Sequence, residues 1–159
     1  MTENKTDKIW TCQICGRPIK AKEGIIAHHG YKRPGDGWQT ASCAGARHKP
    51  YEISCDCLPP AIASIKEHIA RVEARLEEHI NNPPKTLTVM KGYCYNKTPV
   101  EVPLPEGFDA KNPPCCVGMY SYAGEHSDIR RKYERDIKFS KQDLQYMEER
   151  LKNWIPPKE

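Results

Sequence analysis

The chain has 159 residues, of which 38% are hydrophobic and 29% are charged, and it contains only two phenylalanines. This composition excludes one large hydrophobic core, so burial has to come from small cores, helix seams and a bound metal. The formal net charge of +4 comes from 25 basic and 21 acidic residues, and so small an excess does not by itself indicate binding to nucleic acid.

The N-terminal segment, residues 1–9, is a polar tail with no apolar stretch of signal-peptide length. Nowhere does an apolar run approach the roughly eighteen residues that a membrane span requires. We therefore expect a soluble protein that remains in the cytoplasm and does not bind membranes. In that reducing compartment the eight cysteines are expected to bind metal or to stay as free thiols, because disulfides are rare there.

Residues 10–58 are rich in Cys, His and Gly, and such a loop-rich segment needs a staple. Cys12 and Cys15 are separated by two residues and precede Gly16, which is the pattern of a knuckle whose thiolates converge on one tetrahedral metal ion. A redox pair would require a surrounding βαβ pattern, which this sequence lacks. Cys43, also beside a glycine, is the expected third ligand.

The fourth ligand has several candidates. His29 lies about midway between Cys15 and Cys43, so a hairpin centred there would return it to the knuckle. His48 follows Cys43 at a Cys-x4-His spacing, which is within the range of paired zinc ligands. The residues that remain open for this position are His28, His29, His48, Cys55 and Cys57. We favour His29, and three thiolates with one neutral imidazole would fill all four positions of a structural Zn2+ ion.

Residues 59–82 are predicted to form the first helix. Pro59 and Pro60 suit a first helical turn, and the Asn-Asn-Pro-Pro run that begins at Asn81 ends the helix. Apolar residues at steps of three and four form one stripe. The stripe consists of Ile62, Ile65, Ile69, Val72, Leu76 and Ile80.

Residues 83–124 are predicted to be a proline-rich insert that resembles a β-hairpin. Two β-like runs, 86–95 and 98–102, flank a candidate turn at Asn96 and Lys97. Frequent prolines limit any sheet here to short edge strands. A second metal site or redox pair is conceivable from Cys94, Cys115, Cys116 and His126, but adjacent cysteines have poor geometry for either, and we expect ordinary partly buried thiols.

Residues 125–155 are predicted to form a second, longer helix, with Ser127 as its N-cap and Pro156 after its end. Its apolar residues are Ile129, Tyr133, Ile137, Leu144, Met147, Leu151 and Trp154. Two helices with one narrow seam each are expected to pack as an antiparallel coiled-coil hairpin, or to dimerise through the same seams. The surplus length of the second helix should dock on the zinc module or on a partner. The predicted fold class is α+β: a small zinc-binding module, then this helical hairpin with its insert.

Three stretches of the zinc module share one pattern: Cys12-Gln-Ile-Cys-Gly-Arg-Pro-Ile, then His29-Gly-Tyr-Lys-Arg-Pro-Gly-Asp-Gly-Trp-Gln-Thr-Ala-Ser-Cys43, then Pro50-Tyr51-Glu52. This pattern resembles a family of uncharacterised zinc-finger-like proteins of bacteriophages and bacterial mobile elements. The resemblance implies a phage or mobile-element origin, and hence the cytoplasm of a host cell. It also favours His29 as the ligand, because the His before Gly-Tyr recurs in that pattern, but it implies no agreed activity.

A weaker resemblance is to the ββα-metal nucleases, because His28 and His29 precede a proline-glycine loop and Cys43 follows it. Ala27 stands where those enzymes have an acidic residue before the catalytic histidine, and the expected Asn and second Cys-x-x-Cys are missing. Metal-assisted cleavage needs a base and an open metal position. A divergent nuclease is therefore a distant alternative, and we expect no enzymatic activity.

Residues 12–50 carry seven basic and two acidic residues, with aromatic residues between them, so loop 31–49 has the character of a phosphate-gripping and base-stacking surface. The candidate contacts are Lys32, Arg33, Trp38, Arg47 and Lys49. The second helix has eight basic and seven acidic residues between positions 125 and 154, and such a mixed surface suits a protein better than a duplex. We predict a non-enzymatic zinc-binding interaction protein that binds and modulates a host or phage protein, with DNA or RNA binding as the alternative.

Overall fold

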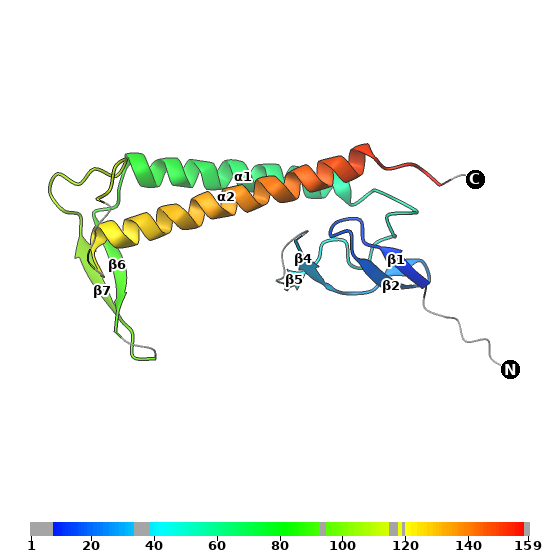
Figure 1. Cartoon of the computed structure of the whole chain (residues 1–159), viewed down its shortest axis with the longest axis horizontal. Helices are drawn as coiled ribbons and strands as arrows, with labels where there is room; N and C mark the ends of the chain where they lie inside the picture. The colour runs from blue at the N-terminus through cyan, green and yellow to red at the C-terminus, as the bar shows by residue number, and fades with distance from the viewer. Residues whose placement is uncertain (1–7, 34–38, 93–94, 115–117, 119, 158–159) are drawn as a thin grey trace. The chain divides into compact units, whose positions relative to one another are not determined.

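A computed structural model describes residues 8–33, 39–92, 95–114, 118 and 120–157 of the chain (Figure 1). The chain divides into two compact units. Unit 1 contains Met1–Glu67 and Ser140–Glu159, and unit 2 contains His68–Phe139. Two helices and several small antiparallel sheets make the protein α+β, as the sequence predicted. Neither of the described helices combines the length and apolar character that crossing a bilayer requires.

Unit 1 contains two small antiparallel sheets (Figure 1). The first consists of β1 (Lys8–Thr11), β2 (Pro18–Lys22) and β3 (Ile25–Ile26), in that order. The second pairs β4 (Gly30–Lys32) with β5 (Gln39–Ser42). Strands this short cannot be recognised from composition or periodicity, so the sequence alone predicted only a loop-rich module here.

The start of β1 corrects one predicted boundary. Residues 1–9 were assigned to a polar tail, but Lys8 pairs with Ala21 and Ile9 pairs with Lys20. The knuckle reverses the chain and lays β2 beside the segment before Trp10. The backbone pairing with β2 therefore includes Lys8 and Ile9. The composition of a segment does not reveal which other segment it will pair with.

The two helices are α1 (Leu58–Asn81) and α2 (Tyr122–Lys152), of 24 and 31 residues. Each helix contributes one segment to each unit. The observed bounds differ by one to three residues from the predicted 59–82 and 125–155. Differences of this size are ordinary at helix ends, where the last turns fray.

The N-cap of α2 was predicted wrongly. Ser121 Oγ accepts a hydrogen bond from the backbone N–H of Gly124 at 3.1 Å, so Ser121 caps the helix. Ser127 lies inside α2. A capping side chain satisfies one of the four unpaired N–H groups of the first turn, and Ser121 meets this need six residues earlier than the apolar stripe indicated.

In unit 1, the last turns of α2 pack against the knuckle, as the surplus length of this helix predicted. Arg150 donates from Nε to the carbonyl of Gln13 at 2.9 Å and from Nη2 to the carbonyl of Cys12 at 3.1 Å. Tyr51 donates to the carbonyl of Arg150 at 2.6 Å, and the indole N–H of Trp154 donates to the carbonyl of Tyr51 at 2.7 Å. The buried core of this unit contains Cys12, Ile14, Cys15, Cys43, Cys57, Leu58, Ile62 and Met147.

In unit 2, β6 (Thr86–Lys91) pairs antiparallel with β7 (Thr98–Pro103). The first strand therefore ends well before position 95, and the predicted two-residue turn at Asn96 and Lys97 is wrong. Pairing stops at Gly92, whose φ is +127° and where a Cβ would lie 2.2 Å from the carbonyl oxygen of Asn96. Only glycine fits that backbone conformation and that approach.

The α1 and α2 segments of unit 2 run antiparallel. His68 Nε2 lies 3.1 Å from Asp136 Oδ1, and further along the pair His79 and His126 stack with ring centroids 3.9 Å apart. The Nε2 atom of each stacked ring donates to the backbone carbonyl of the other residue at 3.1 Å. The Nε2 atom of each imidazole therefore has a hydrogen-bond partner inside the seam, where both side chains are buried.

Candidate metal centre

The knuckle after β1 is a tight turn held by its own backbone. The N–H of Gly16 donates to the carbonyl of Cys12 at 3.1 Å, and the N–H of Cys12 donates to the carbonyl of Arg17 at 3.0 Å. Gly16 has a φ of +68°, the left-handed conformation that the sequence predicted for it. The space beside it is also closed, because a Cβ there would lie 1.9 Å from Tyr146 Oη.

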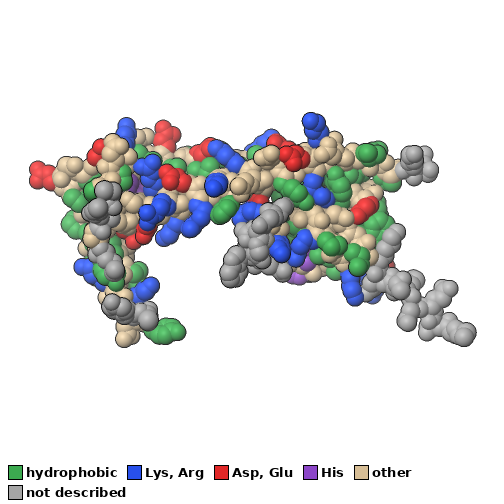
Figure 2. Space-filling view, viewed as in Figure 1, with side chains coloured by type: hydrophobic (Ala, Val, Ile, Leu, Met, Phe, Trp, Pro, Cys, Tyr) green, Lys and Arg blue, Asp and Glu red, His purple; other side chains and the backbone are tan. Residues whose placement is uncertain are grey.

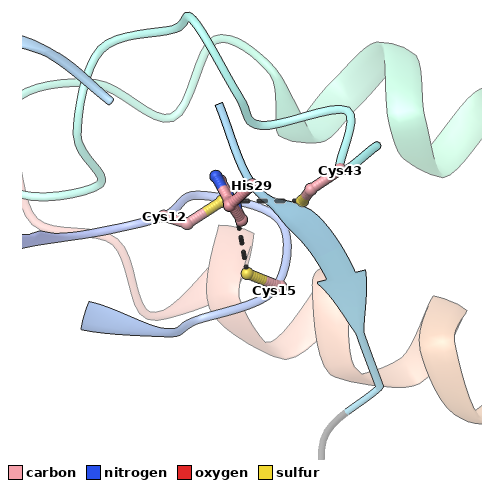
Figure 3. A group of neighbouring side chains, drawn as sticks. All are labelled: Cys12, Cys15, His29 and Cys43. Atoms are coloured by element: carbon pink, nitrogen blue, oxygen red, sulfur yellow. Dashed lines mark hydrogen bonds between the residues drawn. The ribbon is translucent and has the colours of Figure 1, made fainter. Parts of the chain in front are cut away.

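His29 immediately precedes β4 and turns its ring toward the knuckle (Figure 3). Its Nδ1–H donates to the carbonyl of Ala27 at 2.8 Å, while its Nε2 lies 3.4 Å from Cys15 Sγ. The backbone bond fixes the tautomer, so Nε2 presents its lone pair. This arrangement, with one ring nitrogen held and the other open, is how histidine ligands are normally oriented toward a metal.

Cys43 completes the group from the end of the β5 strand. Its N–H donates to the carbonyl of His29 at 2.9 Å, which ties the two ligand-bearing segments together. Its Sγ lies 3.8 Å from that of Cys12 (Figure 3). One ligand atom from each of Cys12, Cys15, His29 and Cys43 lies within 4.8 Å of all the others, and these four residues could bind a metal ion.

The ionisation of these thiols shows why a cation suits the cluster. The pKa of Cys15 lies far below its usual range because Cys12 and Cys43 hydrogen-bond to its sulfur. The pKa of Cys12 is raised by its hydrogen bond to Cys15 and by burial, although its hydrogen bond to Cys43 lowers it in part. The pKa of Cys43 is raised by its hydrogen bonds to Cys12 and Cys15 and by burial. Without a cation the three buried thiols cannot all ionise together, whereas a bound divalent ion would favour three thiolates.

Two neighbours stabilise negative charge at the cluster. Arg17 hydrogen-bonds with Cys15 and thereby lowers its pKa, and its guanidinium also donates to the carbonyl of Gly30. The backbone of Gly45 hydrogen-bonds with Cys43. A Cβ at position 45 would lie 2.4 Å from Cys12 Sγ, so glycine is required for that approach. Three thiolates and a divalent cation carry a net charge of −1, which Arg17 offsets.

The other candidates for the fourth ligand lie elsewhere. His28 is exposed and its Nε2 lies 2.8 Å from Ser42 Oγ. His48 and Cys57 belong to a second group with Asp56. Cys55 is half-buried beside the core and is in neither group of possible metal ligands. All five cysteines of the described chain are free thiols, whereas Cys94, Cys115 and Cys116 fall outside the residues that the structure describes.

The residues predicted to contact nucleic acid have different surroundings. The guanidinium of Arg33 forms two hydrogen bonds with the carboxylate of Asp143, each of 2.9 Å, and Tyr31 donates to the same carboxylate at 2.8 Å. The guanidinium of Arg33, which was expected to bind a phosphate, therefore binds the buried Asp143 of α2. Lys32 is half-buried, Arg47 and Lys49 are exposed, and Trp38 is not among the described residues.

Sequence reasoning missed Gln13, which lies between the two knuckle cysteines and is completely buried. Its amide donates to the carbonyl of Lys49 and to Asp56 Oδ1, each at 2.8 Å, and its carbonyl accepts from the N–H of Cys57 at 2.8 Å. Glutamine is normally exposed, so no compositional signal marked this one. It connects the knuckle to the loop that leads into α1.

No protein-family model, curated protein or solved structure matches this chain. The residues themselves therefore supply the grounds for a function.

Proposed function

We propose that this chain is a non-enzymatic interaction protein of phage or mobile-element origin, in which one structural Zn2+ ion staples unit 1. Three thiolates and one imidazole are the donor set of structural zinc sites, whereas Mg2+ and Ca2+ prefer oxygen ligands. Four protein ligands complete a tetrahedron and leave no position for a reacting water. The ion would then contribute folding energy and no chemistry.

An apolar groove in unit 2 carries the interaction part of the proposal. It has a volume of about 460 Å³ and is lined by Leu76, Ile80 and Ile137, together with Glu73, Glu77, Asn81 and Glu134. The three apolar side chains belong to the predicted seams, yet each remains half-buried. An apolar floor with glutamates at its rim is typical of a surface that receives another chain.

The occupant that fits this groove is an amphipathic helix of a host or phage protein. Its apolar face would cover the floor, and a Lys or Arg side chain beside that face would meet Glu77 of the rim, because Glu134 already pairs with Arg130. A coiled-coil arrangement of the two helices would leave the groove open to such a third helix. The proposed place of action is the host cytoplasm.

The test compares two substitutions of apolar residues in unit 2. Affinity purification with the wild-type chain should capture a stoichiometric protein, and Leu76→Glu should abolish that capture because it places charge on the groove floor. Met90→Glu changes an exposed residue of β6 outside the groove and should leave capture unchanged. Equal capture by both variants would overturn the proposal. A homodimer in light scattering that Leu76→Glu converts to a monomer would also overturn it, because a second copy of the chain would then occupy the groove.

Nucleic-acid binding remains the second candidate because Arg47 and Lys49 are exposed beside the cluster. Figure 2 shows Lys and Arg side chains along the helices interspersed with Asp and Glu, and Arg130 and Arg131 are paired with Glu134 and Asp128. Paired cations release few counterions on binding, so their contribution is small. Binding that weakens steeply with salt and with Arg47→Ala and Lys49→Ala would favour this alternative.

A divergent nuclease has the least support. His28 would be its catalytic histidine, but the described neighbours include no acidic partner for that ring, which instead contacts Ser42. Magnesium-dependent cleavage that disappears in both His28→Ala and His29→Ala would be needed to establish it.

A further inference from the structure

A second group of possible metal ligands lies in unit 1, in the loop between the first cluster and α1. One ligand atom from each of His48, Asp56 and Cys57 lies within 4.8 Å of the other two. Cys57 is 7% exposed, whereas His48 and Asp56 are exposed. A buried sulfur atom of Cys57, a nitrogen atom of the exposed His48 and an oxygen atom of the exposed Asp56 therefore lie close together.

Gln13 holds this group in place from the knuckle. Its buried amide fixes the carboxylate of Asp56 through Oδ1 and fixes the backbone of Cys57 through the N–H, each at 2.8 Å. The same side chain binds the carbonyl of Lys49, next to His48, at 2.8 Å. The backbone carbonyl of His48 also accepts from Ile26 N–H at 2.9 Å. The carboxylate of Asp56 and the backbone of His48 and Cys57 are thus positioned by bonds that do not involve a metal, and such outer contacts help to orient metal ligands.

The chemistry of the three groups suits a cation of the zinc class. The hydrogen bond from Gln13 holds the pKa of the Asp56 carboxyl below its usual range, so Asp56 is ionised at neutral pH. Burial and the neighbouring Asp56 raise the pKa of the Cys57 thiol to about 12. A borderline-soft divalent ion binds thiolate, imidazole and carboxylate together and displaces the thiol proton.

The space beside the group is a surface cavity of about 560 Å³, whose lining includes both His48 and Cys57. The remainder of the wall is largely apolar, with Ile14, Ile65 and Met147 among its residues. Three protein ligands leave one position of a tetrahedral ion open, which distinguishes such a site from a closed structural one. Here that position would face a cavity large enough for a small ligand.

We propose that His48, Asp56 and Cys57 bind a second divalent metal ion of the zinc class, and that its fourth position takes a water molecule or a small anion from solution. This site is separate from the group formed by Cys12, Cys15, His29 and Cys43. It shares no ligand with that group, although Gln13 connects the two and Cys57 packs in the same buried core as Cys12, Cys15 and Cys43.

Metal stoichiometry tests the proposal. The full chain, reduced and freed of metal, is titrated with Co2+, which reports each thiolate ligand by its charge-transfer absorption. The wild type should bind two equivalents, and both Cys57→Ala and His48→Ala should bind one. Because Cys57 is buried, its variant alone could fail through misfolding, but the exposed side chain of His48 can be removed without opening the core.

Two matched controls make the outcome decisive. Cys55→Ala removes a neighbouring thiol outside both groups, and His68→Ala removes an imidazole of unit 2 whose side chain is 38% exposed. Both should still bind two equivalents. One equivalent in the wild type would overturn the second site and leave the first intact, and two equivalents in both Cys57→Ala and His48→Ala would also overturn it.

The open position has its own readout. Azide added to the Co2+-loaded wild type should shift the absorption of the second ion, and His48→Ala, which retains only the first ion, should show no shift. An unchanged wild-type spectrum would mean that the fourth position is closed and would overturn that part of the proposal.

Discussion

The two units of this chain are stabilised by different chemistry. Every cysteine that the structure describes lies in unit 1, and all three tryptophans of the sequence fall in its two segments. Both phenylalanines, Phe108 and Phe139, fall in unit 2. In unit 2, Phe108 meets the rings of Tyr122 and His126 edge-on, each with centroids 5.1 Å apart. The described thiols are thus concentrated in unit 1, whereas stacked and edge-on rings pack in unit 2.

The difference shows two ways of folding a chain with little apolar sequence. Unit 1 joins distant segments by polar contacts of side chains with backbone, such as that between Arg150 and Gln13, 137 positions apart. Such contacts are directional but individually modest, so a metal ion at the proposed site would add stability that the loops otherwise lack. Unit 2 brings two helices together along a seam, where buried apolar area and ring stacking add to the polar contacts.

Removal of the metal is expected to produce the largest difference in stability between the two units. Cys12→Ser, or chelation of the wild type, is expected to unfold unit 1 because a structural zinc ion contributes on the order of 10 kcal/mol to such small modules. The helical segments of unit 2 should keep their amide protection. Tryptophan fluorescence reports unit 1 alone, since all three tryptophans lie there, and hydrogen exchange reports unit 2.

Cys55→Ser is the control for this experiment, because Cys55 is outside both groups of possible ligands. Its tryptophan melting curve should match that of the wild type. An unchanged curve for Cys12→Ser would show that the cluster does not staple unit 1.

Two aspartates of α2 extend the comparison to ion pairs. Asp143 is 8% exposed and receives three hydrogen bonds from Tyr31 and Arg33. Asp143→Ala removes the buried carboxylate that accepts from both partners and should lower the free energy of unfolding of unit 1 by about 2 to 3 kcal/mol. Urea titration followed by tryptophan fluorescence measures this change.

Asp136→Ala is the counterpart in unit 2, where the carboxylate meets His68 at an exposed position. It should change stability by less than about 1 kcal/mol, as exposed pairs usually do. Equal effects of the two substitutions would contradict the view that Asp143 is a buried organiser of unit 1.

Two glycines with left-handed backbone isolate the role of crowding at the knuckle. Gly16 and Gly24 have φ values of +68° and +78°, but a Cβ would meet Tyr146 only at the first position and nothing within 4 Å at the second. Gly24→Ala should cost about 1 kcal/mol through backbone strain. Gly16→Ala should cost roughly twice that in thermal melts, because Tyr146 must also move. Equal costs would show that Tyr146 yields freely.

The sequence predicted the parts of unit 1 in which spacing dictates chemistry. Cys12, Cys15 and Gly16 form a local pattern, and a nearby glycine marked Cys43 as the third ligand. His29 followed from the expected hairpin and from the family resemblance. The five short strands of unit 1 were not predictable, because strands of two to five residues are too short to show a recognisable alternation of apolar and polar residues. Gln13 and Asp56 escaped for a similar reason, since a buried polar residue is recognisable only when its partners are known.

The helical seams of unit 2 were predictable from periodicity, but their polar members were passed over. His79 follows Leu76 by three residues, and His126 precedes Ile129 by three. Both imidazoles therefore sit on the apolar stripes, and a titratable residue at such a position requires a partner inside the seam. The same reasoning applied to Asp143, four residues before Met147, would have marked it as buried.

His126 provides the smallest and most local test, now from the side of unit 2. Burial lowers the pKa of His126 below its ordinary value, the hydrogen bond to the carbonyl of His79 raises it in part, and the charges of His79 and Arg130 lower it further. Its Nδ1 is buried and, within the described part of the chain, has no hydrogen-bond partner. A proton there would be an uncompensated charge.

Because the folded pKa of His126 lies below the unfolded value of about 6.5, the unfolded state binds more protons under that pH. Unit 2 should therefore keep its stability above about pH 6.5 and lose it progressively as the pH falls toward the folded pKa. Protection factors of the α2 amides that lie in unit 2, residues 122–139, corrected for intrinsic exchange, measure this separately from unit 1. His126→Gln should flatten the dependence, whereas His68→Gln, at an exposed pair, should retain it. Burial disfavours protonation of a neutral histidine. Wild-type protection that stays constant between about pH 7.5 and 5.5 would therefore contradict this prediction, because it would show that the stacked pair accepts a proton without loss of stability.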